Sequence, residues 1–513
     1  MTGRALISVY DKTDLAPFVR GLDELGFEVV ASGGTRAFLE EEGIPVTGVE
    51  ALTEFPEMLG GRVKTLHPRI HAGILARREV ESDLAEIARE GIEPFDLVCV
   101  NLYPFEEAAA RRGVSEEGVV EMIDVGGPSM LRAAAKNHSS VTAVCKPEDY
   151  EDVLRELRSR GGETSLETRR RLAATAFATT AAYEAAIAQW FAEDEQFAQI
   201  LIPVFEKSRG LSYGENPHQG AAFYVERGAR SHLLSMVEQL HGRELSFNNL
   251  NDLNAARLLV REFTLPACVI VKHANPCGVA VGATIEEAYE RALAADPLSA
   301  YGGVVVLNRA VTATLGPRLT EQFVEVLFAP GYDQTALEAL LQKPATRILN
   351  DMERRDAEPA ERDYKRVLGG LLVQDRDWDV ADREGMTVAA GKPTEAQWGD
   401  LLFAWRVCKH VASNAIVIVR DLQTIGIGAG QMSRVDSVRI AVEKAKEHGH
   451  SLEGAALASD AFFPFPDGPR LALEAGVGSL IQPGGSKRDE DVVSAVEAAG
   501  ASMIFTGRRH FRH

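Results

Sequence analysis

Short, mostly apolar runs alternate with amphipathic stretches along the first part of the chain. Residues 5–9 and 27–31 have the composition of buried strands, and residues 14–25 between them have helical spacing. A helix is expected to begin at residue 36. The same pattern predicts strands at residues 95–100 and 141–145 and a helix over residues 130–136. Strands that alternate with helices are typical of an α/β domain.

A long helix is predicted to end this first part. Thr164 to Glu167 has the spacing of a capping box, and Tyr183, Ile187 and Trp190 follow at helical intervals. The predicted helix covers residues 165–192, and its apolar stripe indicates a core or subunit contact rather than a cofactor site. Residues 194–199 then form a domain boundary. We therefore expect one domain at residues 1–199 and another at residues 200–513.

The second part continues the alternation of strands and helices. Buried strands are predicted at residues 268–271, 304–307 and 415–419, and a helix at residues 253–261. Residues 351–366 are dense in charge and are expected to form an exposed segment. The fold class predicted for the whole chain is α/β.

Composition and charge restrict the classes of partner. Hydrophobic residues make up 45% and charged residues 25%, as in ordinary globular proteins, and the formal net charge is −20. This charge argues against broad binding to nucleic acid or to an anionic membrane. The five cysteines are scattered without a CxxC pair, which disfavours structural zinc and a disulfide framework and suits the cytoplasm. The apolar stretch in residues 1–10 is too short for a signal or membrane segment.

Two loops of the first part carry candidate phosphate-binding chemistry. Ser32-Gly33-Gly34-Thr35 follows a predicted strand and precedes a helix, an arrangement that directs free backbone N–H groups at a phosphate. The signal is weak alone, because such a sequence is as often only a tight turn. Residues 58–68, with Arg62, Lys64 and Thr65, are rich in glycine and cations, and a solvated basic loop is the plain alternative.

The central motif of the chain is Lys272-His273-Ala274-Asn275-Pro276-Cys277-Gly278. It follows the apolar run 268–271, so Lys272 and His273 are expected where a core strand leaves the sheet, with turn chemistry at Asn275-Pro276 and Gly278. Adjacent residues of a strand point to opposite faces, so the two can share a substrate only if the chain already turns there. On spacing alone, a solvated strand end is the more frequent explanation.

Other motifs of the second part are less specific. A second Lys-His pair, Lys409-His410, precedes the strand predicted at residues 415–419, which would suit two related subdomains. Residues 426–431 are rich in glycine and are predicted to form a tight turn before a helix, because they lack dinucleotide-binding spacing. Residues 459–467 form an aromatic loop that either fills the core or stacks on a flat pterin. The cations of residues 508–513 suggest an anion contact.

Together these motifs resemble one enzyme family. SGGT, MLGGRVKTLHP, HAGILAR, NLYPF, IDVGGPSMLRAAAKNH and KHANPCG match the bifunctional purine-biosynthesis proteins, which combine 5-aminoimidazole-4-carboxamide ribonucleotide (AICAR) formyltransferase with IMP cyclohydrolase. The resemblance runs from residue 7 to residue 513. It implies a methylglyoxal-synthase-like cyclohydrolase domain, followed by a formyltransferase domain made of two cytidine-deaminase-like α/β subdomains.

The resemblance also implies roles in the first domain. Tyr10 stands where some members carry Ser, a change that affects one phosphate-side contact. Lys64 is expected to stabilise the oxyanion, while Tyr103, Asp124 and Lys136 handle protons or orient the amide, in an order that the sequence leaves open. The nucleotide-binding residues implied are Ser8, Lys12, Ser32, Gly33, Gly34, Thr35, Arg62 and Thr65.

In the second domain the resemblance implies formyl transfer from 10-formyltetrahydrofolate to the 5-amine of AICAR. His273 matches the base, Lys272 the neighbouring cation, and Asn414 the residue that orients the formyl carbonyl. Phe462 and Asp467 match the folate side. The implied substrate-binding residues are Tyr213, Asn249, Gly302, Glu325, Arg509 and Phe511. Ser212 replaces a common Arg, and Arg209 is the nearest substitute. Pro276-Cys277 has no second Cys at deaminase spacing, so no catalytic metal is expected.

The family further implies a homodimer with shared formyltransferase sites, reduced folate as co-substrate, and a structural monovalent cation. Two alternatives remain at this point. One is a zinc-free relative of the deaminases that acts on another aminoimidazole. The other is a formyltransferase whose first domain is only a nucleotide sensor. Lys64, Tyr103, Asp124 and Lys136 together argue against a sensor, which needs phosphate contacts but no groups that move protons.

Overall fold

The structure is a computed structural model that describes residues 3–193, 196–227, 234, 237–352 and 361–513. The chain divides into two compact units. The first comprises Met1–Val204 with Glu226–Gly228, and the second comprises Phe205–Val225 with Ala229–His513.

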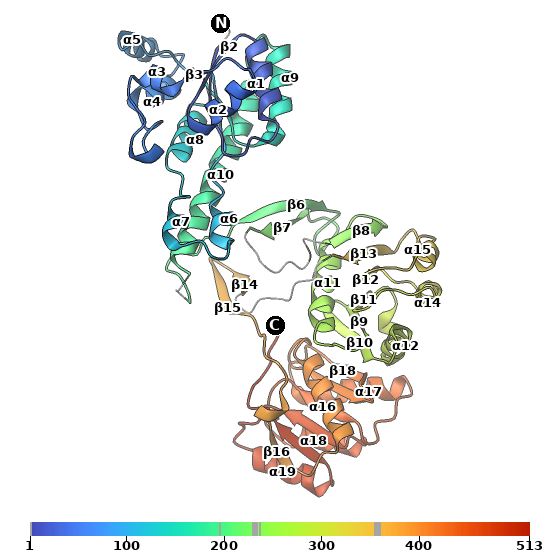
Figure 1. The fold of residues 1–513 in the computed structure, drawn as a ribbon. Helices are drawn as coiled ribbons and strands as arrows, with labels where there is room; N and C mark the ends of the chain where they lie inside the picture. Colours follow the sequence, from blue (N-terminus) through green and yellow to red (C-terminus); the bar gives the residue numbers. More distant parts are fainter. Residues whose placement is uncertain (1–2, 194–195, 228–233, 235–236, 353–360) are drawn as a thin grey trace. The chain divides into compact units, whose positions relative to one another are not determined.

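The first unit, which runs from blue to blue-green in Figure 1, is built on a parallel sheet of five strands. Their order is β3-β2-β1-β4-β5. The strands are β1 (Gly3–Ser8), β2 (Phe27–Ala31), β3 (Thr47–Gly48), β4 (Leu97–Val100) and β5 (Thr142–Val144). Helices cover both faces, as a parallel sheet requires. They are α1 (Leu15–Glu24), α2 (Gly33–Glu41), α3 (Val49–Thr53), α4 (Pro68–Leu75), α5 (Glu81–Arg89), α6 (Phe105–Ala110), α7 (Glu116–Val120), α8 (Gly126–Lys136), α9 (Tyr150–Ser159) and α10 (Leu166–Phe191).

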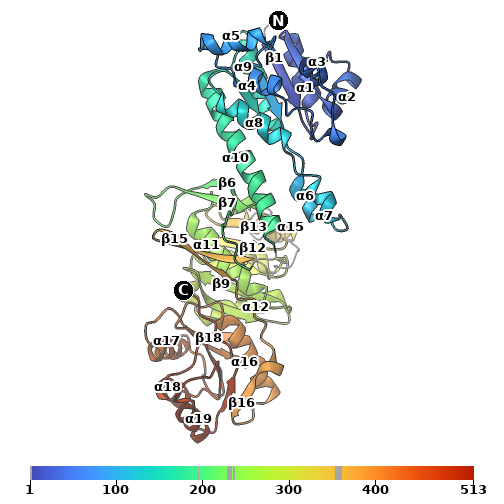
Figure 2. The ribbon, with the colours of Figure 1, turned by 90° about the vertical axis from the view of Figure 1, so that its left-hand side faces the viewer.

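Successive side chains of the central strand β1 enter two separate cores. Ile7 packs with residues of α1 and α9, such as Phe18 and Val153, on one face. Leu6 packs on the other face with residues of α4, α8 and α10, including Leu131. Figure 2 shows α8 and α10 side by side on this second face. The loops that follow the carboxyl ends of the strands are therefore anchored by helices on both faces of the sheet.

The second unit contains one mixed sheet of twelve strands, in the order β16-β21-β20-β19-β17-β18-β10-β9-β11-β12-β13-β8. Its strands are β8 (Val237–His241), β9 (Ala267–Lys272), β10 (Asn275–Val281), β11 (Val304–Leu307), β12 (Val326–Ala329), β13 (Arg347–Asp351), β16 (Thr387–Ala390), β17 (Ile416–Arg420), β18 (Gln423–Gly428), β19 (Ala456–Ser459), β20 (Ser479–Gln482) and β21 (Ser502–Phe505).

The helices of this unit are α11 (Phe247–Val260), α12 (Ile285–Ala295), α13 (Pro297–Ala300), α14 (Leu315–Leu319), α15 (Gln334–Leu340), α16 (Glu395–Cys408), α17 (Arg434–Glu447), α18 (Asp467–Glu474) and α19 (Asp489–Ala498). Two hairpins pair apart from the main sheet. One joins β6 (Phe205–Leu211) with β7 (Ala221–Glu226), and the other joins β14 (Arg362–Val367) with β15 (Gly370–Asp375).

The two halves of the large sheet repeat one structural unit. In each half a helix with a capping box, α11 or α16, precedes an antiparallel hairpin and a second helix. Each hairpin turns through two residues with positive φ, which are His273 and Ala274 in one half and Asp421 and Leu422 in the other. The two halves meet where β10 pairs with β18.

The predicted α/β class is confirmed, and β2 and β11 have the predicted bounds. Several helices begin earlier than their apolar pattern. Helix α2 begins at Gly33 and α8 at Gly126, because their first turns carry glycine residues without apolar periodicity. Helix α11 begins at Phe247, directly after its N-cap Ser246. The charged segment predicted at residues 351–366 lies partly outside the described residues, and its described end forms β13 and β14.

One turn prediction was wrong, and the turn predicted at residues 426–431 holds only for its last residues, where Gly430 has a φ of 66°. Asn275, Pro276 and Gly278 lie in strand β10, and the turn is formed by His273 and Ala274 themselves. Gly426 and Gly428 lie in strand β18, where a Cβ atom would stand 2.1 Å and 2.0 Å from carbonyl oxygens of α17. Glycine serves close packing there rather than turning. Lys409-His410 lies at the C-terminal end of α16 and not at the end of a strand. The structural counterpart of Lys272-His273 in the other half is Arg420-Asp421, at the end of β17.

Candidate active site

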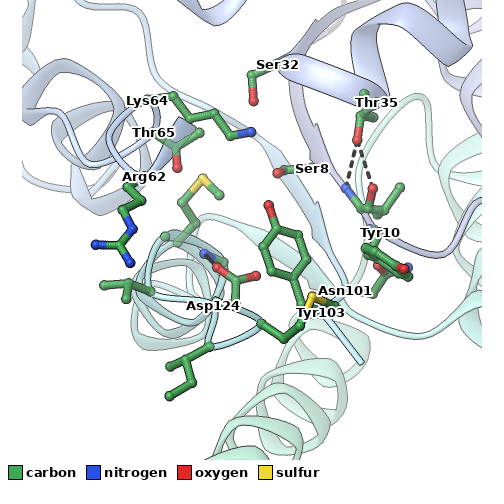
Figure 3. A pocket seen from close by; sticks show the side chains of 18 of the residues that line it. Ser8, Tyr10, Ser32, Thr35, Arg62, Lys64, Thr65, Asn101, Tyr103 and Asp124 are labelled. Atoms are coloured by element: carbon green, nitrogen blue, oxygen red, sulfur yellow. Dashed lines mark hydrogen bonds between the residues drawn. The ribbon is translucent and has the colours of Figure 1, made fainter. Parts of the chain in front are cut away.

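A cavity of 780 Å³ opens at the carboxyl ends of β1 and β4 in the first unit (Figure 3). Loops distant in sequence contribute to it, namely those after β1, β2 and β4, the loop that carries Arg62 to Thr65, and the loop before α8. The predicted residues that line it are Ser8, Lys12, Ser32, Gly34, Thr35, Arg62, Lys64, Thr65, Tyr103 and Asp124.

One end of the cavity is suited to an anion. Helix α2 begins at Gly33, so the backbone N–H groups of its first turn are free of intrahelical partners. The Ser32 hydroxyl is buried and has no hydrogen-bond partner among the described residues. Figure 3 shows the Lys64 ammonium directed towards Ser8 and Ser32. A phosphate placed here would receive backbone donors, two hydroxyls and a positive charge.

Thr35 and Lys12 hold this end in shape. The Thr35 hydroxyl donates to the Val9 carbonyl at 3.0 Å and accepts from the Val9 N–H at 3.1 Å, which ties α2 to the end of β1. Lys12 donates to the carbonyls of Val9 and Tyr10. Burial and the nearby charge of Lys64 lower the pKa of Lys12, while Asp11 acts in the opposite direction.

The opposite end of the cavity holds two groups that can exchange protons. Burial raises the pKa of Asp124, although the Gly127 N–H at 2.8 Å and the charge of Lys64 oppose the shift. Burial and the charges of Asp124 and Glu57 raise the pKa of Tyr103, which keeps its hydroxyl protonated at neutral pH. A Cβ atom on Gly127 would meet Asp124 Oδ2 at 2.3 Å, so only glycine allows this approach.

Two predicted residues do not line the cavity. Gly33 adjoins it, and a Cβ atom there would lie 3.0 Å from Lys64 Nζ. Lys136 is exposed at the last position of α8, whereas Gly126 at the first position faces the cavity. Eleven helical residues separate these ends by about 15 Å. The structure therefore does not bring Lys136 to Tyr103 and Asp124 within one chain.

Several residues that line the cavity or hydrogen-bond to its lining were missed from the sequence. Asn101 accepts from the backbone N–H groups of Tyr10 and Asp11 at 2.5 Å and 3.0 Å, and thereby joins the loops after β1 and β4. Its position directly after a buried strand was the available signal. The Tyr183 hydroxyl on α10 donates to the Met122 carbonyl and accepts from the Asp124 N–H at 2.8 Å. Glu121 pairs with Arg62 at the rim.

In the second unit, one group of predicted residues surrounds the hairpin of β9 and β10. The carboxylate of Asp252 on α11 accepts from the N–H groups of His273 and Ala274 at 3.1 Å and 2.6 Å. Lys272 Nζ donates to the Tyr301 carbonyl at 2.7 Å, next to Gly302. The backbone conformation that Asp252 holds lets Lys272 and His273 leave the sheet together.

Asn249 and Glu325 belong to the same group. Asn249 lies one turn before Asp252 on α11, and its side chain completes the helix capping box with Ser246. It also donates to Glu325 Oε1 at 2.8 Å. The Tyr213 carbonyl accepts from the N–H of Phe247, the first residue of α11. The first turns of α11 therefore connect the predicted substrate-binding residues to the hairpin.

A second group surrounds Asn414. Its side-chain oxygen accepts from Arg434 at 2.7 Å, and its amide donates to the Gln431 carbonyl at 2.8 Å. Arg434 in turn pairs with Asp460, which is fully buried. These contacts leave one orientation for the Asn414 amide. Asn275 Oδ1 accepts from the Ala412 N–H at 2.9 Å and so joins this group to the β9–β10 hairpin.

The remaining predicted residues either lie close in sequence to the second group or belong to a segment that is hydrogen-bonded to it. Phe462 is 40% exposed and follows Asp460 closely, and Asp467 begins α18. Arg509 lies 4.5 Å over the Phe511 ring in the same C-terminal segment, where the His510 N–H donates to the Asp460 carbonyl. No cluster of three or more His, Cys, Asp or Glu that could hold a metal occurs among the residues described. Nor does the described part contain a helix long and apolar enough to cross a membrane.

Comparisons with known proteins cover the whole chain. The sequence profile of the family described as "AICARFT/IMPCHase bienzyme" matches residues 134–444, and that of the "MGS-like domain" matches residues 14–129. Proteins named "Bifunctional purine biosynthesis protein PurH" from Bacillus mycoides and Bacillus cytotoxicus are each 48% identical over the full length of both chains. A solved structure described as "Crystal structure of ForH" is 42% identical and covers 38% of this chain and 98% of its own, with a TM-score of 0.35.

Proposed function

The chain belongs to the AICARFT/IMPCHase bienzyme family of bifunctional purine biosynthesis proteins, and on this premise we propose which residues carry each of the two reactions. The predicted activities are confirmed by this membership. The enzyme transfers a formyl group to the 5-amine of AICAR and then closes the ring of formyl-AICAR to give IMP. The prediction of a methylglyoxal-synthase-like first domain is confirmed as well.

Cyclisation is assigned to the first domain, residues 1–199. One observation carries this assignment, namely that a single cavity joins the anion-binding end at α2 to Tyr103 and Asp124. The substrate phosphate would bind at the N–H groups of Gly34 and Thr35 and at the hydroxyls of Ser8 and Ser32. The imidazole ring would then extend towards Lys64 and Asp124.

The chemistry needs little beyond this arrangement. The carboxamide nitrogen attacks the formamide carbon on the same ring, a C–N bond forms, and water leaves, so the substrate itself supplies most of the proximity. Lys64 stabilises the oxyanion of the tetrahedral intermediate. Asp124 takes one proton from the carboxamide nitrogen, and the formamide nitrogen gives up the second proton, so that the formyl oxygen leaves as water. The Tyr103 hydroxyl, which is protonated at neutral pH, donates a hydrogen bond to the departing oxygen.

Formyl transfer is assigned to the second domain, residues 200–513. The 5-amine of AICAR is a poor nucleophile, because the ring withdraws its lone pair, so a base must take its proton as the new C–N bond forms. His273 is the proposed base. Lys272 stabilises the oxyanion, and Asn414, fixed by Arg434, orients the formyl carbonyl. Tetrahydrofolate leaves with a proton on its N10.

The substrates are assigned to the groups around these residues. We assign the folate to Phe462, whose exposed ring can stack on a pterin, and to Asp467. The residues assigned to AICAR are Tyr213, Asn249, Gly302, Glu325, Arg509 and Phe511. The role of Lys136, at the far end of α8, stays a prediction from the resemblance. So does the homodimer. The cytoplasmic location stays a prediction from the cysteine pattern, and the lack of nucleic-acid and membrane partners stays a prediction from the net charge.

A structural monovalent cation is also a prediction. No step of either reaction uses this ion.

The assignment is tested by assaying the two half-reactions separately in paired variants. We expect His273→Ala to lower formyl transfer by about 10²- to 10⁴-fold and to leave cyclisation of added formyl-AICAR unchanged. We expect Lys64→Ala to lower cyclisation by about 10²- to 10³-fold and to spare formyl transfer. Equal loss of both activities in either variant would contradict the assignment.

The structure offers a matched control for each variant. Asp421→Ala alters the same turn position as His273 in the other half of the sheet, and Lys146→Ala removes an exposed lysine of the first unit. Both should keep wild-type rates. If the wild-type protein forms no IMP from formyl-AICAR, the first domain is a nucleotide sensor, as the alternative holds.

A further inference from the structure

A buried histidine lies within the C-terminal segment between two residues assigned to the nucleotide. His510 is 3% exposed, whereas Arg509 before it and Phe511 after it are exposed. This pattern is that of an extended stretch, in which alternate side chains point to opposite sides. Whatever fixes His510 in the interior therefore fixes the direction of Arg509 and Phe511.

Two carboxylates hold the imidazole of His510. Its Nδ1 lies 2.5 Å from Asp377 Oδ2, and its Nε2 lies 3.6 Å from Asp379 Oδ2. The ring packs against Trp405 of α16, with 4.8 Å between the ring centroids. Both edges and one face of the ring thus have partners, and rotation of the side chain would break at least one polar contact.

The carboxylates are themselves fixed. Lys409 Nζ donates to the backbone carbonyl of Asp379 at 2.9 Å and pairs with Glu262 at 2.5 Å. Arg508 pairs with the side chain of Asp379. Burial raises the pKa of Asp377, but the hydrogen bond and charge of His510 outweigh this and leave the pKa below its usual value. Asp377 is therefore a carboxylate at neutral pH.

The same segment also contacts the residue next to Asn414. The Arg512 carbonyl accepts from the Ser413 N–H at 2.9 Å, and Arg512 donates to the His410 carbonyl at 2.7 Å. The guanidinium of Arg509 lies 4.5 Å over the exposed Phe511 ring. A cation stacked on an exposed aromatic ring presents donors to an anion in a defined direction.

We propose that His510, held by Asp377 and Asp379, is a positioning residue that presents Arg509 and Phe511 to the nucleotide substrate of formyl transfer. This inference rests on the proposed function, in which Arg509 and Phe511 bind AICAR. His510 touches neither substrate nor reacting atoms, and it acts by fixing the path of the segment. Its loss should therefore weaken AICAR binding while leaving folate binding and the chemical step largely intact.

The test compares three full-length variants. His510→Phe keeps a ring against Trp405 but loses both polar contacts, and His510→Gln keeps one amide donor for Asp377. Val496→Ala truncates a fully buried core side chain of α19 and serves as the control for lost stability. Each variant is assayed for kcat, for KM with AICAR and with the formyl-folate donor, for the rate of cyclisation, and for the melting temperature.

We expect His510→Phe to raise KM for AICAR about tenfold, with kcat and KM for the folate changed less than about threefold. His510→Gln should recover part of the loss, and cyclisation should be unchanged in all three. The proposal is overturned if His510→Phe lowers the melting temperature as Val496→Ala does but leaves KM for AICAR unchanged, or if both KM values rise together.

Calorimetric titration with AICAR separates the positioning role from the proposed function. It is done on proteins that also carry Lys64→Ala, so that binding in the first unit is weakened. A wild-type second unit that binds no AICAR refutes the proposed function. Equal affinities of wild type and His510→Phe refute only the positioning role.

Discussion

At the scale of single residues, Lys64 connects the two ends of the cavity in the first unit. It reaches towards Ser8 and Ser32 at the anion-binding end, and its charge also acts on Asp124 at the other end (Figure 3). Burial nevertheless raises the pKa of Asp124 above its ordinary value. One lysine therefore lies at the proposed phosphate site and also acts on the proposed base.

This coupling predicts the pH dependence of cyclisation. If the carboxylate of Asp124 is the active form, the rate falls with acidification through its pKa, and the midpoint lies above the ordinary value of 3.8. Lys64 lowers that pKa, so we expect Lys64→Met to move the acidic limb to higher pH. Lys64→Arg keeps the charge and should leave the limb in place.

The measurement is the pH–rate profile of formyl-AICAR cyclisation, corrected with Lys64→Met/Asp124→Asn as the inactive background. An acidic limb that stays unchanged in Lys64→Met would show that Asp124 does not determine it.

At the scale of secondary structure, the two hairpins of the large sheet form an internal comparison. Asp252 on α11 accepts from the N–H groups of His273 and Ala274, and Asp400 on α16 accepts in the same way from Asp421 and Leu422. All four turn residues have positive φ, which is unfavourable for residues other than glycine. Each aspartate thus stabilises a turn whose own residues do not favour the required backbone conformation.

Removal of these aspartates separates stability from function. Asp252→Ala and Asp400→Ala should each lower the free energy of unfolding by about 1–3 kcal/mol, because two backbone donors lose their acceptor. Only Asp252→Ala should lower formyl transfer, by about tenfold or more, since only that turn positions His273. Denaturant unfolding and the formyl-transfer assay provide the two readings. A similar loss of activity in Asp400→Ala would contradict a specific role for Asp252.

The glycines of β18 make a second prediction at this scale. A Cβ atom at Gly426 would stand 2.1 Å from the Ala441 carbonyl of α17, and backbone cannot yield as a side chain can. We expect Gly426→Ala to destabilise the second unit by about 1–3 kcal/mol or more through overpacking. Gly385→Ala is the control, because no atom lies within 4 Å of its Cβ position. Equal melting temperatures for the two variants would disprove the close packing.

At the scale of the whole molecule, the two reactions should depend differently on assembly. Ten predicted residues of one chain already line the cavity of the first unit, whereas the family resemblance implies formyltransferase sites shared between subunits of a homodimer. With a chain mass of 55.7 kDa, the dimer has twice that mass. Dilution to the monomer should therefore abolish formyl transfer and spare cyclisation.

This prediction is checked by measuring both activities per chain over a dilution series, alongside mass photometry. Formyl transfer should fall in parallel with the dimer fraction. Constant formyl transfer in a sample shown to be monomeric would rule out shared sites.

The strands and the family could be recognised from the sequence alone. Continuous apolar runs such as Val304–Leu307 become strands buried on both faces, because the sheet of an α/β fold is covered by helices on both sides. Motifs such as the one from Lys272 to Gly278 identified the family, because the type and order of their residues match it. Ten of the residues predicted for the first unit meet in one cavity, because loops at the carboxyl ends of parallel strands lie at one edge of the sheet.

The tertiary structure alone decided which side chains share a partner. The pairing of Tyr183 with Asp124, the link from Asn101 to the loop after β1, and the placement of His510 between two carboxylates join residues distant in sequence. The misplaced turn at Asn275 has the same origin. Proline and asparagine signal turns locally, but Asp252 on α11 supplies the two acceptors that turn the chain at His273 and Ala274 instead. Local propensity amounts to about 1 kcal/mol or less per residue, so such long-range contacts can override it.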